Sequence, residues 1–171
     1  KMTEGELRVA DSVNAEVNHA WRSGAARNHT ATHLLHASLR AILGDHVRQQ
    51  GSMVAQDRLR FDFTHLEQTP AEALLEAQQI VNEKVRDNLE VSWRNASYQS
   101  AIESGALAFF GDKYGNEVRV VSIDDSSGRF SAELCGGTHA SRTGNLGYVH
   151  VLRETAVAAG TRRIEAVTGP E

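Results

Sequence analysis

The chain has 171 residues, of which 40% are hydrophobic and 23% are charged, and this composition is typical of one soluble globular domain with its own core. No apolar stretch approaches the roughly 20 residues of a membrane-spanning helix, and the N-terminal segment lacks the apolar stretch of a signal peptide, so we expect a cytoplasmic protein. The formal net charge of -4 excludes a broadly basic surface for nucleic acid. The single cysteine, Cys135, excludes an internal disulfide.

Two helices are predicted near the start of the chain. Apolar residues recur at every fourth position from Val13 to Trp21 and predict a first helix over about residues 11 to 23. A second helix is predicted over about residues 28 to 43, with Asn28 as its N-cap.

A hairpin and a long helix are predicted next. Two extended segments over about residues 47–55 and 58–65, the second alternating apolar and polar residues, predict paired antiparallel strands. Thr69 is the predicted N-cap of the following helix, Pro70 is its first residue, and apolar positions at helical spacing continue through Leu89.

The rest of the chain is predicted to be mostly strand and loop, with one short helix. We expect strands over 90–96, 118–123, 128–134, 148–160 and 161–169, a short helix over 97–105 and a glycine-containing turn over 109–117. The connections are mostly of hairpin length, and strands and helices do not alternate regularly. These features predict an α+β fold with a mainly antiparallel sheet packed with helices.

Two short motifs carry the residue types of a metal site. His29 and His33 are four positions apart on one helix, so their rings can converge on one point, although such a pair alone is compatible with histidines that bind no ligand. Cys135 and His139 are also four apart, across a Gly-Gly turn that lets the backbone fold tightly. Three imidazoles and one thiolate are a ligand set that favours zinc. A small buried thiol, or a nucleophilic thiol beside a histidine, remains the alternative for Cys135.

Five segments together resemble a known family. They are "NHTATHLLHASLRAILGDHVRQQGSMV", "RLRFDF", "FFGDKYGNEVRVV", "ELCGGTHASRTGNLG" and "VAAGTRRIEAVTG". In order and spacing they resemble the editing domain of bacterial alanyl-tRNA synthetase, which is related to free-standing alanyl-tRNA editing proteins and, more distantly, to the editing domain of threonyl-tRNA synthetase. The resemblance implies that His29, His33, Cys135 and His139 form a zinc site. It also implies hydrolysis of tRNA for alanine that is mischarged with serine or glycine.

The resemblance covers about residues 10 to 169 and implies a domain organisation. We expect a single editing domain over residues 1–171, with a lead-in helix over 11–25 and a zinc-containing core over 28–169. The chain has no room for an aminoacylation domain, so we expect a fragment of a synthetase that edits but does not charge tRNA. A compact free-standing editing protein is the alternative.

Selectivity for serine over alanine requires polar groups in the site that hydrogen-bond the serine hydroxyl. Any pocket that admits serine also admits alanine, so the site must contain buried polar groups that stay unpaired with alanine, at a cost of about 1 to 3 kcal/mol each. The resemblance points to Gln49 as the group that reads the hydroxyl, with Gln50 as the alternative because a slip of one residue reverses the face of a strand. Thr30, Asp62 and Gly137 complete the predicted substrate-binding residues; for Asp62, a solvated strand carboxylate is the alternative.

Contact with tRNA requires a local basic patch on this acidic chain. Arg22, Arg162 and Arg163 are the predicted tRNA-binding residues, although scattered basic residues also cluster by chance. Four protein ligands are typical of structural zinc, whereas catalytic zinc keeps an open position. A non-catalytic, zinc-stabilised tRNA-binding module is therefore the alternative function.

Overall fold

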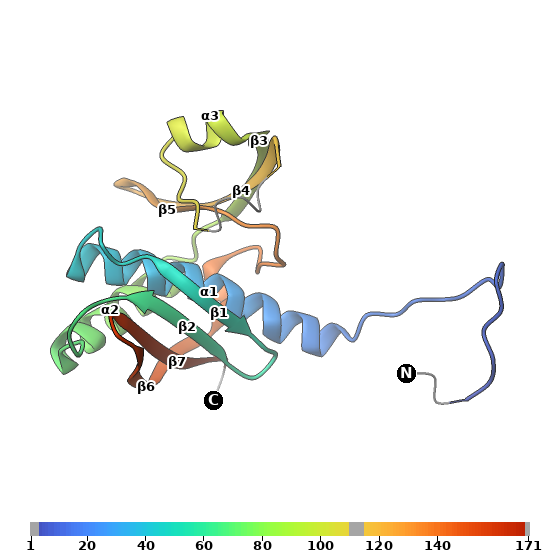
Figure 1. Ribbon diagram of the computed structural model, residues 1–171, viewed down its shortest axis with the longest axis horizontal. Helices are drawn as coiled ribbons and strands as arrows, with labels where there is room; N and C mark the ends of the chain where they lie inside the picture. The colour runs from blue at the N-terminus through green and yellow to red at the C-terminus, as the bar shows by residue number, and fades with distance from the viewer. Residues whose placement is uncertain (1–3, 110–114, 170–171) are drawn as a thin grey trace.

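The computed structural model describes residues 4–109 and 115–169, which form two antiparallel sheets packed with helices (Figure 1). The first sheet has the order β1-β2-β7-β6 and the second the order β3-β4-β5. The predicted α+β class is confirmed, with the strands divided between two sheets. The elements are α1 (His19–Leu43), β1 (Gln49–Val54), β2 (Leu59–Thr64), α2 (Ala71–Arg86), β3 (Val91–Ser97), α3 (Tyr98–Glu103), β4 (Glu117–Asp125), β5 (Gly128–Leu134), the 3-10 helix η2 (Thr143–Leu146), β6 (Tyr148–Ala158) and β7 (Thr161–Gly169).

The predicted helix at 11–23, and with it the lead-in helix at 11–25, is wrong for residues 11–18, which carry no helix. The apolar residues that suggested it, Val13, Val17 and Trp21, are 68%, 52% and 62% exposed. An amphipathic helix is stabilised chiefly by burying its apolar face, and this segment extends away from the other elements (Figure 1).

One continuous helix, α1, replaces the two predicted ones. Its N-cap is Asn18, whose side-chain oxygen accepts a hydrogen bond from the Trp21 amide. Asn28, the predicted cap, instead lies fully buried inside the helix, and its side-chain amide donates to the Ala55 carbonyl at 2.9 Å. The structure therefore uses this polar residue to fix the β1–β2 turn against the helix.

The main core lies between α1, α2 and the four-stranded sheet. Leu34, Leu35 and Leu39 of α1 pack with Phe61 and Phe63 of β2, and all five are fully buried. The alternation along β2 thus places its phenylalanines on the core face, as predicted. The predicted hairpin of β1 and β2 is confirmed.

The start of α2 differs from its prediction. Pro70 occupies the N-cap position without a side-chain hydrogen bond, whereas Thr69 was expected there. The Thr69 hydroxyl instead donates to the Glu154 carboxylate on β6 at 3.1 Å. Because the Glu154 side chain is only 2% exposed, its carboxylate needs buried donors, and this tertiary contact outweighs the local cap.

The second sheet carries α3 and a smaller core made of Val118, Val120, Ala132 and Leu134 under Ala101. In Figure 1 this sheet and α3 stand apart from the first sheet, with α1 passing between the two. The segment after β5 returns toward α1. Most of the predicted turn at 109–117 lies outside the described residues. Among the described helices, none is both long and apolar enough to span a membrane.

Candidate metal centre

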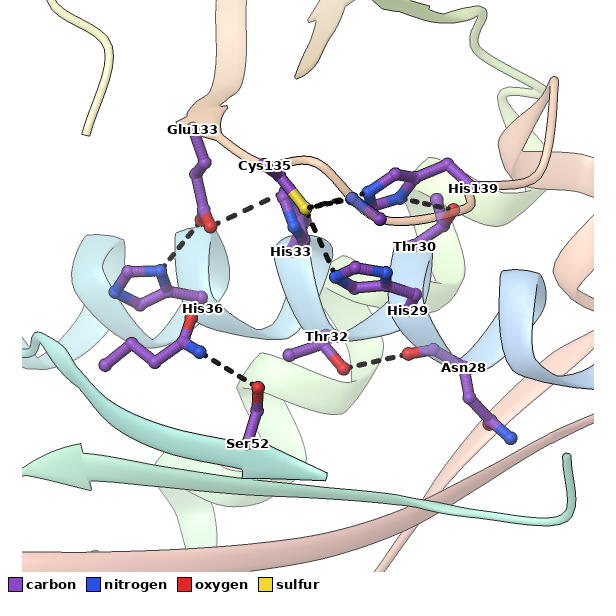
Figure 2. A network of polar contacts seen from close by, with 12 residues as sticks. Asn28, His29, Thr30, Thr32, His33, His36, Ser52, Glu133, Cys135 and His139 are labelled. Atoms are coloured by element: carbon purple, nitrogen blue, oxygen red, sulfur yellow. Dashed lines mark hydrogen bonds and ion pairs between the residues drawn. The ribbon is translucent and has the colours of Figure 1, made fainter. Parts of the chain in front are cut away.

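Side chains from opposite parts of the chain converge where the segment after β5 meets α1 (Figure 2). His29, His33, Cys135 and His139 each offer one ligand atom, and these atoms all lie within 4.8 Å of one another. The Cys135 Sγ lies 3.3 Å from Nε2 of both His29 and His139. Tetrahedral zinc with ordinary bond lengths separates its sulfur and nitrogen ligands by about 3.3 to 3.6 Å. The four residues therefore fit a metal ion of this kind.

Helix geometry and a glycine turn bring the four ligands together. On α1, the rings of His29 and His33 lie on one face with centroids 5.3 Å apart. On the turn after β5, a Cβ atom added to Gly137 would overlap the His29 ring, lying 2.5 Å from its Nδ1 atom. A glycine is required at this position because the imidazole occupies the space of a side chain.

The ring nitrogens that face away from the cluster have polar partners. The Nδ1 atom of His139 lies 3.1 Å from the Thr30 hydroxyl, which also accepts a hydrogen bond from the Ala140 amide. The Nδ1 atom of His33 lies 3.5 Å from the Glu133 carboxylate, which is within ion-pair distance but is not a hydrogen bond. Histidines that bind metals usually hydrogen-bond through their second nitrogen, as His139 does with Thr30, and this contact fixes the tautomer and the orientation of the ring (Figure 2).

Burial keeps the histidines of the cluster uncharged. Desolvation, followed by the nearby imidazoles, lowers the pKa of His29 to about 4 and that of His139 to about 2, and burial also lowers the pKa of His33. Neutral imidazoles offer the lone pairs that a metal needs. Burial raises the pKa of the Cys135 thiol, so without a cation it is a poor nucleophile. These shifts disfavour the thiol–histidine alternative.

Glu133 was not predicted as a site residue. It is 4% exposed, and its carboxylate lies 2.8 Å from Nδ1 of His36 as well as beside His33. Although burial favours the neutral acid, these histidines hold the pKa of Glu133 below its usual value. The signal was present in the sequence: Glu133 lies two residues before Cys135 at the end of a strand, where residues two apart share a face.

The predicted substrate-binding residues lie in different surroundings. Thr30 is fully buried against His139, and Gly137 lies against His29, so both touch the metal cluster. Gln49 is half-buried at the start of β1, and its amide donates to the Ser52 hydroxyl at 2.9 Å. Gln50 is exposed at a break in the pairing register between β1 and β2. Their roles in substrate binding stay predictions.

Asp62 and the two arginines of β7 all take part in ion pairs within the first sheet. Asp62 accepts two hydrogen bonds from Arg163, at 2.6 and 2.8 Å, and is neither solvated nor in described contact with the cluster. Arg162 donates twice to Glu154, at 2.6 Å each. A tRNA phosphate would have to compete with these carboxylates, so the predicted tRNA contacts remain predictions. Arg22 is exposed and makes no ion pair within residues 4–109 and 115–169.

Comparisons with known proteins agree with this geometry. Residues 118–165 match the family model described as the threonyl and alanyl tRNA synthetase second additional domain. The alanine–tRNA ligase of Halorhodospira halophila is 52% identical over 169 residues, which cover 99% of this chain and 19% of the ligase. The predicted resemblance to the alanyl-tRNA synthetase editing domain is thereby confirmed. The alanine–tRNA ligase of Nitrosococcus oceani is likewise 52% identical over 165 residues, covering 96% of this chain and 18% of the ligase.

The chain is thus similar, over nearly its whole length, to one segment of alanine–tRNA ligases. It spans about a fifth of the length of the relatives it matches. The family-model match runs from the second residue of β4 through β5 and β6 into β7, and it includes both candidate ligands of the turn, Cys135 and His139. The other two ligands, on α1, lie within the longer similarity to the ligases.

Proposed function

We propose that this chain is a zinc-dependent hydrolase that removes serine or glycine from mischarged tRNA for alanine, acting as part of a synthetase in the cytoplasm. One observation carries the proposal: four neutral donor groups of zinc-binding type converge within 4.8 Å in a chain similar to alanine–tRNA ligases. The relatives are alanine–tRNA ligases, which supports the substrate class.

Each residue of the cluster has a role in this proposal. His29, His33, Cys135 and His139 hold the zinc ion, which when bound supplies a Lewis acid for cleavage of the aminoacyl ester. Thr30 and Glu133 act as positioning residues. The first fixes the His139 ring through Nδ1, and the second fixes the ring of His33.

Gln49 is our proposed reader of the serine hydroxyl. Gln49 is half-buried and therefore less hydrated than the exposed Gln50, whose hydrogen bonds to a substrate would compete more with solvent. The hydrogen bond from Gln49 to Ser52 identifies Ser52 as a second polar group beside it. Figure 2 shows Ser52 on the β1 side of α1, the side to which Thr32 also points.

The ligand count favours a second candidate function. Four protein ligands close a tetrahedral zinc site, which is typical of a structural metal. Under this candidate the chain is a non-catalytic, zinc-stabilised tRNA-binding module. Two cavities of about 200 Å³ each nevertheless reach the cluster, one lined by His139 and the other by Cys135 and Gly136, and they support access of a substrate to the metal.

Deacylation assays test the proposed function. We expect the purified, zinc-loaded chain to remove serine from tRNA for alanine faster than it removes alanine. Cys135→Ala should abolish zinc binding and deacylation together, because it removes one of four ligands. Equal rates for the two aminoacyl groups, with the metal present at full stoichiometry, would overturn the selectivity.

Chelation separates the enzyme from the structural candidate. If the zinc is catalytic, its removal should stop hydrolysis while circular dichroism shows a folded chain. If removal unfolds the chain outright, the metal contributes folding free energy and the tRNA-binding module is favoured. Hydrolysis that continues in metal-free Cys135→Ala would contradict the zinc mechanism directly.

A further inference from the structure

A tryptophan and an arginine form a stacked pair on the second sheet. Trp93 on β3 pairs with Val121 on β4, and Arg119 lies two residues from Val121 on the same strand face. The Arg119 guanidinium lies over the Trp93 ring at 4.8 Å from its centroid. Trp93 is nevertheless 61% exposed, so much of this large aromatic surface still faces solvent. An exposed tryptophan held in one orientation by a cation is a rigid, flat surface for stacking.

The stacked pair is joined directly to the metal cluster. Arg119 donates a hydrogen bond of 2.6 Å to the carbonyl of Gly137, and its own carbonyl accepts from the Cys135 amide at 3.0 Å. A cavity of about 200 Å³ lies beside the pair and is lined by Trp93, Arg119 and His139, among others. The stacking surface and a metal ligand thus line the same cavity.

The size and charge of this cavity define its occupant. A volume of about 200 Å³ is below the roughly 300 to 1,000 Å³ of pockets that enclose drug-sized ligands, so it fits one ring system rather than a whole nucleotide. Its lining includes the cation Arg119 and no carboxylate. An aromatic face next to a cation, with no negative charge nearby, is the combination that proteins use to hold an unpaired nucleic-acid base.

We propose that Trp93 is a stacking platform for the terminal base of the acceptor strand, and that Arg119 links this platform to the metal turn. The proposal rests on the proposed function, because the aminoacyl ester is carried by the ribose of that terminal nucleoside. With the base on Trp93, the ribose lies toward His139 and the ester toward the metal cluster. The platform therefore orients the substrate and takes no part in bond cleavage.

Fluorescence tests base binding without hydrolysis. The chain has two tryptophans, so in Trp21→Phe the emission reports on Trp93 alone. We expect adenosine 5′-monophosphate to quench this emission in a saturable manner, and ribose 5-phosphate, which lacks a base, to leave it unchanged. Equal responses to both compounds, or no response to either, would overturn the proposal.

Kinetics of Trp93 variants test the role of the platform. Trp93→Ala should lower kcat/KM for deacylation about 5- to 100-fold, mainly through a higher KM, because base stacking is lost in ground state and transition state alike. Trp93→Phe keeps a flat ring and should recover most of the loss. Trp21→Ala is the matched control, since Trp21 is 62% exposed but lies on the first turn of α1, and it should behave like the unchanged chain.

Two outcomes distinguish this proposal from its alternatives. If Trp93→Ala loses zinc stoichiometry and adenosine 5′-monophosphate causes no quenching, Trp93 only supports Arg119 and the platform is refuted. If the base quenches Trp93 but the chain hydrolyses no aminoacyl-tRNA, the platform stands and the proposed hydrolase fails. Normal deacylation by Trp93→Ala would refute the platform and leave the hydrolase intact.

Discussion

The metal cluster and the two arginines of β7 are both polar regions of the molecule, yet they differ in how their side chains are satisfied. On β7, Arg163 pairs with Asp62 and Arg162 pairs with Glu154, so each guanidinium meets a carboxylate. In the cluster, three uncharged imidazoles and a thiol each bring one nitrogen or sulfur atom within 4.8 Å of the others, and no carboxylate or guanidinium group belongs to the set. Such an arrangement offers up to four ligand atoms to one cation.

This difference separates a ligand site from a structural network. An ion pair between two side chains satisfies both partners, whereas converging imidazoles and a thiol are a donor set that can bind a metal ion. The sequence singled out Asp62, Arg162 and Arg163 for function as readily as the histidines. Their internal pairing is visible only in three dimensions, because the partners Asp62 and Arg163 lie 101 residues apart.

The largest expected difference between the two regions is in how each one's contribution to the free energy of unfolding changes with pH. His29 has a pKa of about 4 in the folded chain against 6.5 when unfolded. Its contribution to the free energy of unfolding is therefore constant above pH 6.5. As the pH falls toward 4, the unfolded chain binds the proton more readily, and about 3 kcal/mol of that free energy is lost. Hydrogen bonds from Arg162 and Thr69 outweigh burial and lower the pKa of Glu154, so its contribution is lost only below its ordinary value of 4.5. Urea titrations of metal-free chain at pH 7, 5.5 and 4.5 measure this loss.

The control for this acid effect is His29→Gln, which should reduce the slope of unfolding free energy against pH between 6.5 and 4.5, while His33 and His139, whose pKa values are also lowered, maintain the rest of it. An unchanged slope in that variant would show that the cluster does not carry the effect.

Backbone packing at the turn should have the next largest effect. Gly137→Ala places a Cβ atom inside the His29 ring, so the turn or the ring must move, and overpacking of this kind costs about 1 to 3 kcal/mol. Gly136→Ala is the matched control, because its Cβ atom would have no neighbour within 4 Å. Thermal unfolding and zinc affinity should change in the first variant only; equal changes in both would contradict the close approach to His29.

The carboxylates of Glu133 and Glu154 allow the two regions to be compared through their effects on zinc affinity. Glu133→Gln should lower zinc affinity about 10- to 100-fold, as expected for the loss of a carboxylate that orients a metal-binding histidine. Glu154→Gln, which removes a carboxylate from the β7 network, should leave zinc affinity unchanged. Competition with a chromophoric chelator measures both, and a similar loss in the two variants would remove the distinction.

The smallest expected effect is the change in zinc affinity when an ion pair of β7 is broken. Arg163→Gln breaks the ion pair with Asp62 and should reduce stability, but zinc affinity should stay within about twofold because distant sites act independently. Titration of tRNA for alanine with the same variant tests the predicted contact. A large loss of tRNA affinity at unchanged zinc content would establish that Arg163 leaves its carboxylate for a phosphate.

Much of the fold follows from periodicity in the sequence. The β1–β2 hairpin, α2 and the paired strands were predicted because their apolar residues are buried at the spacing of each element. The helix over residues 11–18 failed because Val13 and Val17 have the right spacing but no surface to cover them. The spacing of apolar residues shows which face of a helix would be apolar, but whether another element packs against that face is decided by the tertiary structure.

The convergence of the four predicted ligands could be anticipated because each pair is local in sequence, at a spacing that constrains its geometry; that they bind a metal stays a prediction. The surrounding groups were harder to predict. The break in register beside Gln50 interrupts the alternation from which strand faces are assigned. Thr69 and Asn28 stand at suitable capping positions in the sequence. In the structure, however, the Thr69 hydroxyl bonds to the Glu154 carboxylate and the Asn28 amide bonds to the Ala55 carbonyl, and both partners are distant in sequence.

The distance along the chain between the ligands affects how the protein folds. His29 and Cys135 are 106 residues apart, so their contact forms only after α1 and the second sheet have come together. A cation held by both would act as a cross-link, and a covalent cross-link around a loop of this length contributes about 5 kcal/mol by restricting the unfolded chain. Metal loading should therefore slow hydrogen exchange where α1 meets the second sheet more than at the far edge of the first sheet.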